Sequence, residues 1–206
     1  MTHIRKGGRY GMPMDYTKDS IRSALISLLN ERPLHKISVK SIADQVGISR
    51  NTFYYHFKSV PDLLEQTMNE AAERMIREHP TANSMEECIL GAYAFVRKNP
   101  HAVEHIYHSA DRGVYEDFVI KMCDHTAHVL AQEYMSGSDI TPEEQRLMTY
   151  FIKCELLGMC IDWSKNGMND DIVGRYHLTV DAFTQMSREL LTPAKNFSIT
   201  NHAPVS

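Results

Sequence analysis

The sequence predicts an all-α protein of about nine helices, in which a three-helix unit with a helix-turn-helix precedes a larger helical domain. Three observations lead to this prediction. Apolar residues recur at spacings of three and four along most of the chain, as in amphipathic helices. No alternation of apolar and polar residues lasts beyond a few positions, and Ser, Pro, Gly and Asn punctuate the periodic stretches as helix caps and stops do. With 43% hydrophobic residues among 206, the chain can bury a proper core.

The first helix is predicted to open near Thr17 or Asp19 and to stop at Pro33, because a residue that precedes proline disfavours the helical conformation. Ser38 stands where an N-cap belongs and opens a second, short helix. Gly47 has the conformational freedom to end that helix in the left-handed region.

Ser49 can cap a third helix that runs to about His56. Ser59 and Pro61 are typical of the cap and first turn of a fourth helix, which is long and continues until Pro80. The remaining helices are predicted at about residues 85–98, 100–109, 113–135, 142–165 and 170–191.

The stretch from Val39 to Phe53 has the spacing of a helix-turn-helix. Two short helices that cross steeply leave room for only a small side chain at their contact, and Ala43 supplies it. Gly47 then makes the turn. The apolar seam between the two helices is predicted to consist of Ile42, Val46, Ile48 and Phe53.

The stretch after the turn, SRNTFYYHF from Ser49 to Phe57, combines four aromatic rings with polar hydrogen-bonding groups. An aromatic core stripe would explain Phe53 and Phe57, but successive positions on a helix cannot all face inward. The helical offsets place four side chains on the outward face: Arg50, Asn51, Tyr54 and Tyr55. Tyrosine and serine hydroxyls bond phosphate oxygens well, while arginine and asparagine can read base edges. The stretch therefore indicates contact with DNA.

The distribution of charge favours the same interpretation. The net charge is −4, yet residues 1–60 hold ten Lys or Arg against four Asp or Glu, and residues 61–206 hold twelve against twenty-two. A basic end on an acidic body lets only that end meet a polyanion. A chance distribution of surface charge is the competing explanation, so the asymmetry alone favours DNA only modestly.

Composition also bears on the cellular compartment. No run of about 18 apolar residues suggests a membrane span, and the N-terminal residues carry no apolar stretch typical of a secretory signal. We therefore expect a cytoplasmic protein without a membrane partner. The cysteines form no close pair in the sequence and are expected to be reduced and mostly buried: Cys88, Cys123, Cys154 and Cys160.

Residues 17–64 resemble the N-terminal domain of the TetR family of bacterial transcriptional regulators, notably in the pattern IxVxxIAxxxGISRxTFYxHF. The remainder is similar only in outline, although the WSKNGM of residues 163–168 is also common in such proteins. The resemblance implies a DNA-binding domain followed by a helical ligand-binding and dimerisation domain. We accordingly divide the chain into a flexible basic arm (1–14), the helix-turn-helix domain (15–61), the second domain (62–191) and a disordered tail (192–206).

The resemblance also implies roles for individual residues. Arg50 and Asn51 would reach base edges in the major groove, with Lys40 of the preceding helix as a further candidate. The phosphate contacts would come from a set around them: Ser38, Thr52, Tyr54, Tyr55 and His56. Ser49 is a further DNA-binding candidate. Where the family usually has a phosphate-holding lysine, this chain has Val60, and Lys58 is the nearest substitute. A basic arm containing Arg5, Lys6 and Arg9 could enter the minor groove, or could be no more than a disordered leader.

The second domain offers candidates for two further sites. Methionines and aromatic residues suit an adaptable apolar pocket for a small-molecule effector, although ordinary core packing explains the same composition. The candidate pocket residues are Met75, Tyr93, Phe118, Met122 and Phe151. Stripes along the last two helices suggest a twofold interface between two copies of the chain, or a contact within one chain. The candidate interface residues are Phe151, Cys154, Gly158, Ile161, Tyr176, Val180 and Phe183.

Histidines are the weak candidates for a metal site. His101, His105 and His108 share one face of a short helix, but eleven histidines make chance groupings common, so no metal and no cofactor are expected. No catalytic motif stands out, and an enzyme is not expected. The function that follows is a homodimeric repressor released from its DNA operator by a small-molecule ligand. The alternative is a TetR-like co-regulator that acts mainly through protein contacts.

Overall fold

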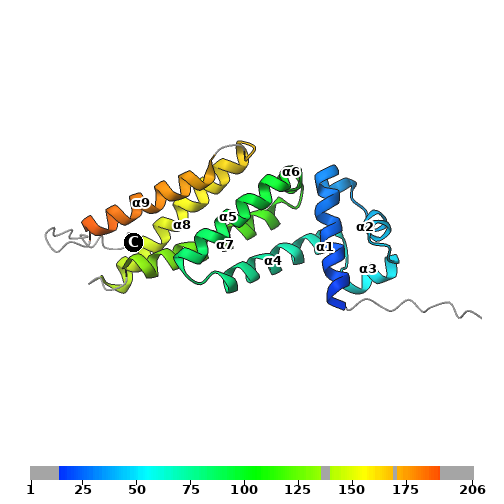
Figure 1. Ribbon diagram of the computed structural model, residues 1–206, viewed down its shortest axis with the longest axis horizontal. Coiled ribbons are helices and arrows are strands. Elements are labelled where there is room, and N and C mark those ends of the chain that lie inside the picture. The colour runs from blue at the N-terminus through cyan, green and yellow to red at the C-terminus, as the bar shows by residue number, and fades with distance from the viewer. Residues whose placement is uncertain (1–13, 136–139, 169–170, 191–206) are drawn as a thin grey trace, which may run out of the picture. The chain divides into compact units, whose positions relative to one another are not determined.

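The computed structural model describes residues 14–135, 140–168 and 171–190, and these form helices joined by short connections (Figure 1). No strand occurs in this part of the chain, which confirms the all-α prediction. The helices are α1 (Met14–Glu31), the short 3₁₀ helix η1 (Leu34–Lys36), α2 (Val39–Val46), α3 (Arg50–His56), α4 (Val60–Glu78), α5 (Ala82–Lys98), α6 (Pro100–Tyr107), α7 (Arg112–Met135), α8 (Pro142–Lys165) and α9 (Ile172–Leu190). None of these helices is both long and apolar enough to cross a membrane.

Two helices begin earlier than predicted. α1 starts at Met14 rather than near Thr17, and α5 starts at Ala82 rather than at about residue 85. In both cases the additional first turn carries too few core-facing apolar residues to extend the pattern of threes and fours, so a search for apolar periodicity does not detect it. Residues 82–84 therefore lie within α5.

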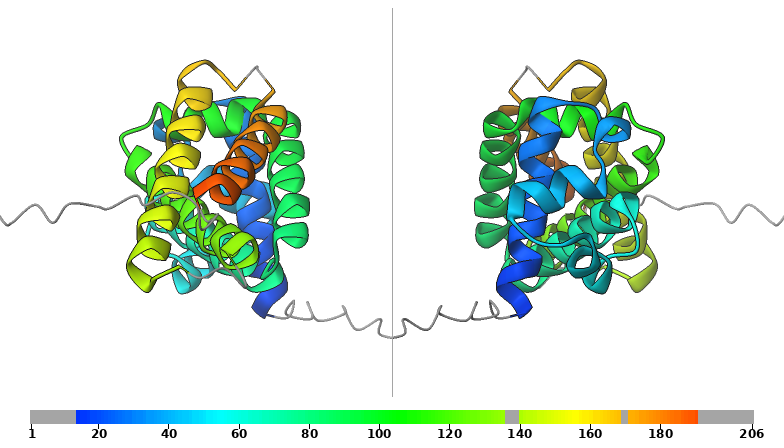
Figure 2. Two further views of the ribbon diagram at one scale, coloured as in Figure 1. Left: turned by 90° about the vertical axis from the view of Figure 1, so that its left-hand side faces the viewer. Right: turned by 90° about the vertical axis from the view of Figure 1, so that its right-hand side faces the viewer.

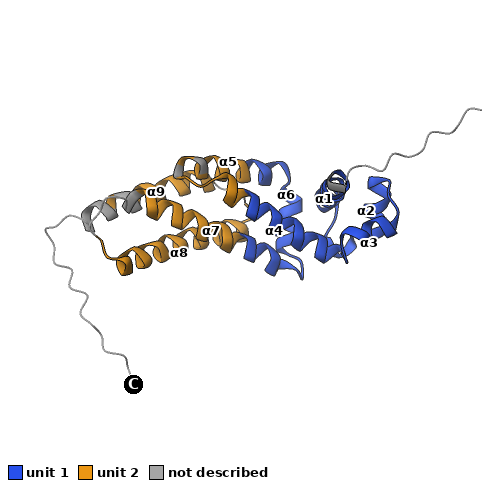
Figure 3. Cartoon of the chain, turned by 90° about the horizontal axis from the view of Figure 1, so that it is seen from below, with its two compact units in different colours: residues 1–74, 94–118 blue, residues 75–93, 119–206 orange. Residues whose placement is uncertain are grey.

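The described residues group into two compact units (Figure 3). Unit 1 consists of the chain up to Arg74 together with Ala94–Phe118, and unit 2 consists of Met75–Tyr93 and the chain from Val119 onward. Unit 1 therefore holds α1 to α3, most of α4, and all of α6. The boundary predicted between residues 61 and 62 falls in the first turn of α4.

Unit 1 is built around α1, against which α2 and α6 pack, and α3 packs against α2 (Figure 2, right). Phe53 of α3 and Phe57, the residue that ends this helix, are 0% and 1% exposed, so the inward orientation predicted for these two rings is confirmed. Their rings lie 5.9 Å apart between centroids. The buried cluster around them draws on α1, α2, α4 and α6: Ile21, Leu25, Leu28, Leu29, Ile42, Val60, Leu63, Leu64, Ala102 and Ile106.

Hydrogen bonds, as well as the packing of this core, hold α6 against the end of α1. The N-cap residue of α6, Asn99, makes no side-chain capping bond. Instead, Oδ1 of Asn30 in α1 accepts a hydrogen bond from the Ala102 amide at 3.2 Å, and Nδ2 of Asn30 donates to Oδ1 of Asn99 at 2.8 Å. Nδ1 of His105 donates to the Leu29 carbonyl at 2.7 Å. α1 thus supplies the cap that α6 lacks, which explains why α6 belongs to unit 1.

The turn between α2 and α3 is set by caps at both of its ends. The Ser38 side chain accepts from the Ser41 amide and the Ser41 side chain accepts from the Ser38 amide, which forms a capping box at the start of α2. Gly47 ends α2 with φ of 77°, in the left-handed region as predicted. Any other L residue except asparagine or aspartate is strained there.

Replacing Gly47 by alanine should therefore destabilise the protein by about 1–2 kcal/mol, since the left-handed conformation costs an alanine that much. No atom lies within 4 Å of an added Cβ, so the backbone conformation alone is responsible. Gly91→Ala is the matched control, because Gly91 sits within α5 with equally open surroundings. That change should stabilise the helix by up to about 1 kcal/mol. Urea unfolding of the two variants measures both effects, and equal shifts in the same direction would contradict this account.

In unit 2, α8 and α9 lie side by side (Figure 2, left). The rings of Tyr93 and Trp163 lie 6.3 Å apart between centroids. Lys153 of α8 joins α7 through a salt bridge to Asp124, with 2.6 Å between Nζ and Oδ1. The buried residues of these helices form the core of the unit: Met85, Cys88, Cys123, Ala127, Leu130, Ile152, Leu156, Trp163, Ile172 and Tyr176.

Candidate nucleic-acid interface

α3 is held rigidly at its first turn. The Ser49 hydroxyl accepts a hydrogen bond from the Thr52 amide at 3.0 Å, and the two hydroxyl oxygens lie 2.9 Å apart. Because Ser49 and Thr52 are bonded to one another, their hydroxyls are positioned on one side of the helix start. Phe53 anchors the other side of the helix in the core.

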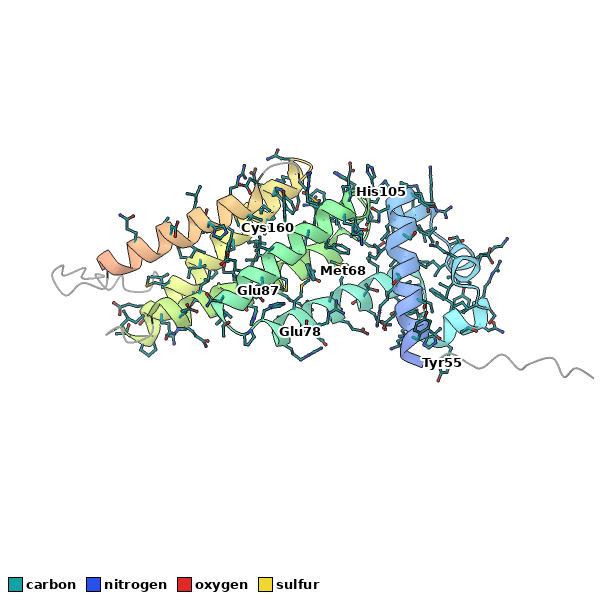
Figure 4. The ribbon with its side chains drawn as sticks, viewed as in Figure 1. Tyr55, Met68, Glu78, Glu87, His105 and Cys160 are labelled. Atoms are coloured by element: carbon teal, nitrogen blue, oxygen red, sulfur yellow. The ribbon has the colours of Figure 1, made fainter. Side chains whose placement is uncertain are left out.

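The outward face of α3 carries the side chains that the sequence places there. Arg50 and Asn51 are exposed. Tyr54 is 55% exposed and Tyr55 is 73% exposed, and Tyr55 points outward from unit 1 (Figure 4). The ring of Tyr54 packs edge to face against the buried ring of Phe53, with 5.7 Å between the centroids. The Tyr54 ring is therefore held by this contact while its hydroxyl end is exposed. Whether these four side chains touch DNA stays a prediction.

Other predicted contact residues flank this face. Lys40 is exposed on α2, and Lys58 is exposed between α3 and α4. Ser38 is exposed, but its hydroxyl already accepts the capping bond from Ser41. His56 is half-buried, and its pKa is lowered first by burial and then by the positive charge of Lys18. His56 is therefore mainly neutral near pH 7, and it would act on a phosphate as a hydrogen-bond donor rather than as a cation.

Lys18 is a basic residue near this surface that the sequence reasoning missed. It lies on α1, close enough to His56 to affect its titration. Helical periodicity could have placed Lys18 on the half-exposed side of α1. No pattern in the sequence shows which end of α1 meets α3, because that contact depends on how the helices pack.

At the start of α4, a buried valine stands at the position where the resemblance leads one to expect a lysine. Val60 is 8% exposed and belongs to the buried cluster of unit 1. Side chains of the first turn of α4 cap this helix. The Asp62 amide donates to the Ser59 hydroxyl at 3.1 Å, and Oδ2 of Asp62 accepts from the Lys58 amide at 2.7 Å. Val60 thus contributes to packing and offers nothing to a phosphate.

The Asp62 cap gives a pH-dependent prediction. The hydrogen bond from the Lys58 amide is the main reason that the pKa of Asp62 is lowered from its ordinary value of 3.8. A lowered pKa means that the ionised carboxylate stabilises the fold above about pH 4, and that this contribution is lost as the pH falls through the folded-state pKa. Asp62→Ala should cost about 1 kcal/mol at pH 7. The difference from the unaltered protein should vanish in acid.

Urea unfolding of Asp62→Ala between pH 7 and pH 3 measures this difference, with Glu65→Ala on the exposed side of α4 as the control. The control should change stability by less than about 0.5 kcal/mol at every pH. A cost for Asp62→Ala that stays constant into acid would show that the carboxylate charge is not responsible.

The predicted pocket residues do not converge on one described cavity. Met75, Tyr93 and Met122 are half-buried in unit 2, whereas Phe118 belongs to unit 1. Phe151 is 58% exposed and lines a surface groove of about 350 Å³ on unit 2. The groove is mainly apolar and is lined by Leu130, Phe151, Ile152, Glu155, Leu178, Thr179, Val180 and Ala182. The placement of an effector pocket stays a prediction.

The predicted interface residues whose side chains are described divide into three groups. Phe151, Cys154 and Gly158 are exposed on α8, while Ile161 and Val180 are half-buried. Tyr176 is only 4% exposed, so its ring packs within the chain and is not available to a second copy. The Phe183 side chain lies outside the described residues. Three large exposed apolar residues were not predicted for this surface, namely Leu147 and Tyr150 of α8 and Leu178 of α9.

The histidines considered as metal ligands are exposed or make other contacts. His105 is bonded to the Leu29 carbonyl, and His101 is exposed with its Nδ1 3.6 Å from a Glu104 carboxylate oxygen. His108 is exposed at the end of α6. In unit 2, Nε2 of His125 donates to the His79 carbonyl at 2.9 Å. Within the described ranges, no three His, Cys, Asp or Glu side chains are grouped so that they could hold a metal ion.

Known proteins that match this chain also combine a helix-turn-helix domain with a helical C-terminal region. Residues 21–67 match the family described as bacterial regulatory proteins, tetR family, and residues 83–173 match a transcriptional regulator C-terminal region. Together the two matches cover more than half of the chain. The chain therefore belongs to the TetR family of DNA-binding transcriptional regulators, as the resemblance of its helix-turn-helix implied.

Curated relatives include the HTH-type transcriptional regulator EthR of Mycobacterium tuberculosis, which is 34% identical over 90 residues. An EthR of Mycobacterium bovis matches equally. The aligned segment covers 40% of this chain and 42% of each relative, so the match spans less than half of their length.

Solved structures share the fold. They include the dihydroxyacetone kinase operon activator DhaS, with a TM-score of 0.68, 17% identity, and coverage of 84% of this chain and 97% of that one. FadR of Bacillus subtilis in complex with stearoyl-CoA has a TM-score of 0.55 at 20% identity, covering 81% and 97%. NalD, a repressor of Pseudomonas aeruginosa, has a TM-score of 0.54 at 15% identity, covering 84% and 97%. At these identities the likeness shows the fold alone.

Proposed function

We propose that this protein is a cytoplasmic, homodimeric repressor that binds a DNA operator through α3 and leaves it when a small-molecule effector binds unit 2. We propose no enzymatic activity. The observation that carries the proposal is that α3 has two faces: Phe53 and the C-cap residue Phe57 are buried, while four polar or amphipathic side chains are exposed. A helix anchored in this way can enter a major groove without losing its packing.

The exposed side chains suit the two kinds of contact that a reading helix makes. Arg50 and Asn51 stand in the first turn of α3, where the N-terminal residues of a recognition helix meet base edges. Tyr54 and Tyr55 follow one turn later, and their hydroxyls suit phosphate oxygens. Lys18 and Lys40 would add charge that strengthens binding without reading sequence.

Purified protein tested against fragments from the chromosomal neighbourhood of its own gene should bind a specific fragment in an electrophoretic shift. The binding should weaken steeply with salt, because each neutralised phosphate releases counterions. Equal affinity for every fragment would contradict the proposed operator.

Dimerisation is supported by the exposed apolar side chains of α8 and α9. Tyr150, Phe151 and Leu178 are 64%, 58% and 70% exposed, and burying large apolar side chains against a second copy is favourable. Gly158 has no atom within 4 Å of an added Cβ, so the surface is open there to a close helix approach. Two copies would present two α3 helices to successive major grooves.

The combined change of Phe151 and Leu178 to glutamate should convert the dimer into monomer, because it would bury charges in an apolar interface. Sedimentation at micromolar concentration measures the change, and a dissociation constant raised by at least about 100-fold is expected. Ile120→Glu is the control, since Ile120 is also an exposed apolar residue of unit 2 but lies on α7. A double variant that stays dimeric would place the interface elsewhere.

A second function is favoured by one observation. Because Val60 is buried where the family usually has a phosphate-holding lysine, DNA affinity could be low enough for the protein to act as a co-regulator through protein contacts. The dihydroxyacetone kinase operon activator DhaS has this fold. Tight operator binding by the isolated protein would refute the co-regulator function.

A further inference from the structure

We propose that regulation by unit 2 reaches the DNA-reading helices through α7 and α6, and that Asn30 and His105 are the positioning residues that join α6 to α1. This inference rests on the proposed function, because it names the route by which an effector would release DNA. It is carried by two hydrogen bonds through which α1 and α6 cap one another.

The end of α1 and the start of α6 each leave a backbone group without its regular helical partner. The Leu29 carbonyl would accept from the residue four positions later, but that residue is Pro33, which has no N–H. The Ala102 amide lies in the first turn of α6, where amides have no partner within the helix. His105 of α6 donates to the Leu29 carbonyl at 2.7 Å. Asn30 of α1 accepts from the Ala102 amide at 3.2 Å, so each helix completes the hydrogen bonds of the other.

Apolar packing holds the same two helix ends together. α6 packs against α1, and His105 lies at their contact (Figure 4). Ala102 and Ile106 of α6 are buried in the same cluster as Leu25 and Leu29 of α1. Polar caps and a shared core together make α1 and α6 one mechanical unit, because neither helix can shift without breaking both kinds of contact.

The other end of α6 is joined to α7 through a buried tyrosine. The Tyr107 ring packs edge to face with that of Tyr115, with 5.7 Å between the centroids. The guanidinium carbon of Arg112 lies 4.5 Å from the centroid of the Tyr107 ring, and Nη2 of Arg112 lies 2.7 Å from a Glu116 carboxylate oxygen. Three side chains of the first turns of α7 thus fix its start on the last residue of α6.

α7 is one continuous helix that belongs to both units. Its residues 112–118 lie in unit 1, whereas residues 119–135 lie in unit 2 and contribute buried side chains to the core of that unit. A displacement of α7 in unit 2 would therefore be passed along the helix to α6, and through the reciprocal caps to α1. α2 packs against α1 and α3 packs against α2, so the displacement would reach the reading helix.

The route can be tested from the DNA end, because coupling between two sites is reciprocal. The probe is the operator fragment selected by the electrophoretic shift, added to the full-length protein. Hydrogen exchange is measured with and without this fragment. The fragment should slow exchange at the amides of α6 and of residues 112–118 by at least about 5-fold, although neither segment belongs to the reading surface.

A variant that combines Asn30→Ala with His105→Leu removes both caps. In this variant the fragment should still slow exchange in α2 and α3, but its effect on α6 should disappear. The measured effect is the ratio between free and bound protein, so a merely less stable α6 would not remove it. Asn30→Asp keeps an oxygen acceptor for the Ala102 amide and should retain most of the effect. His101→Leu, at an exposed position of the same helix, is the control and should retain all of it.

The outcomes separate this inference from the proposed function. Slower exchange in α2 and α3 without slower exchange in α6 of the unaltered protein would overturn the route, as would an equal effect in the double variant. An effect in the last turn of α4 with none in α6 would place the connection in α4 instead. The measurement on the unaltered protein decides even where the double variant unfolds. If no fragment binds, the proposed DNA binding is refuted, and this inference falls with it.

Discussion

Replacement of Arg50 and Tyr54 by alanine together is expected to abolish specific DNA binding. Arg50 is exposed in the first turn of α3, and Tyr54 is exposed on the next turn. A bidentate arginine contact to a base is worth about 1–3 kcal/mol, and loss of a phosphate contact adds to this. The combined loss of roughly 2–5 kcal/mol should raise the dissociation constant at least about 30-fold.

Single changes separate the two roles in this prediction. Arg50→Ala should relax the sequence preference, because it removes a base contact, whereas Tyr54→Phe should weaken binding to all sequences alike, because it removes only a hydroxyl. Arg97→Ala removes one positive charge from an exposed position of α5 and serves as the control. Fluorescence anisotropy at fixed salt measures all four proteins. Unchanged affinity in the double variant would remove α3 as the reading helix.

The second large effect concerns the core beneath that surface. Phe53→Ala should destabilise unit 1 by about 3–5 kcal/mol, since the ring is fully buried and its loss leaves a cavity. That cost is a large part of the 5–15 kcal/mol typical of folded proteins. DNA binding should therefore be lost with Phe53→Ala as well, although Phe53 itself touches no DNA in this account.

Hydrogen exchange distinguishes this loss from that caused by Arg50 and Tyr54. In Phe53→Ala, the amides of α2 and α3 should lose most of their protection, while the double surface variant should keep it. Phe53→Leu should restore much of the protection, because it refills most of the volume. Protection in α2 and α3 that is unchanged by Phe53→Ala would mean that this ring does not hold the two helices together.

The features that the sequence predicts correctly are those decided by local chemistry. Ser49 caps α3 because its hydroxyl accepts a hydrogen bond from a free amide of the first turn. Gly47 ends α2 because a residue without Cβ adopts the left-handed conformation without strain. The two faces of α3 follow from helical geometry and the burial of phenylalanine. These local rules suffice to place the candidate reading surface within a few residues.

The features that it misses depend on contacts between distant segments. Nothing near Asn99 indicates that Asn30 caps α6 from another helix. The stripe along α9 predicts Tyr176 as an interface residue, but that ring is buried and Leu178 is exposed instead, because periodicity marks an apolar face without saying what covers it.

Methylation interference on the selected operator tests most directly whether the exposed tips of α3 read the major groove. Methylation of guanine N7, which lies in that groove, should block binding at two patches about 34 Å apart. In Arg50→Ala, interference at one guanine in each patch should disappear. Interference confined to adenine N3 in the minor groove, or a pattern that Arg50→Ala leaves unaltered, would contradict the account.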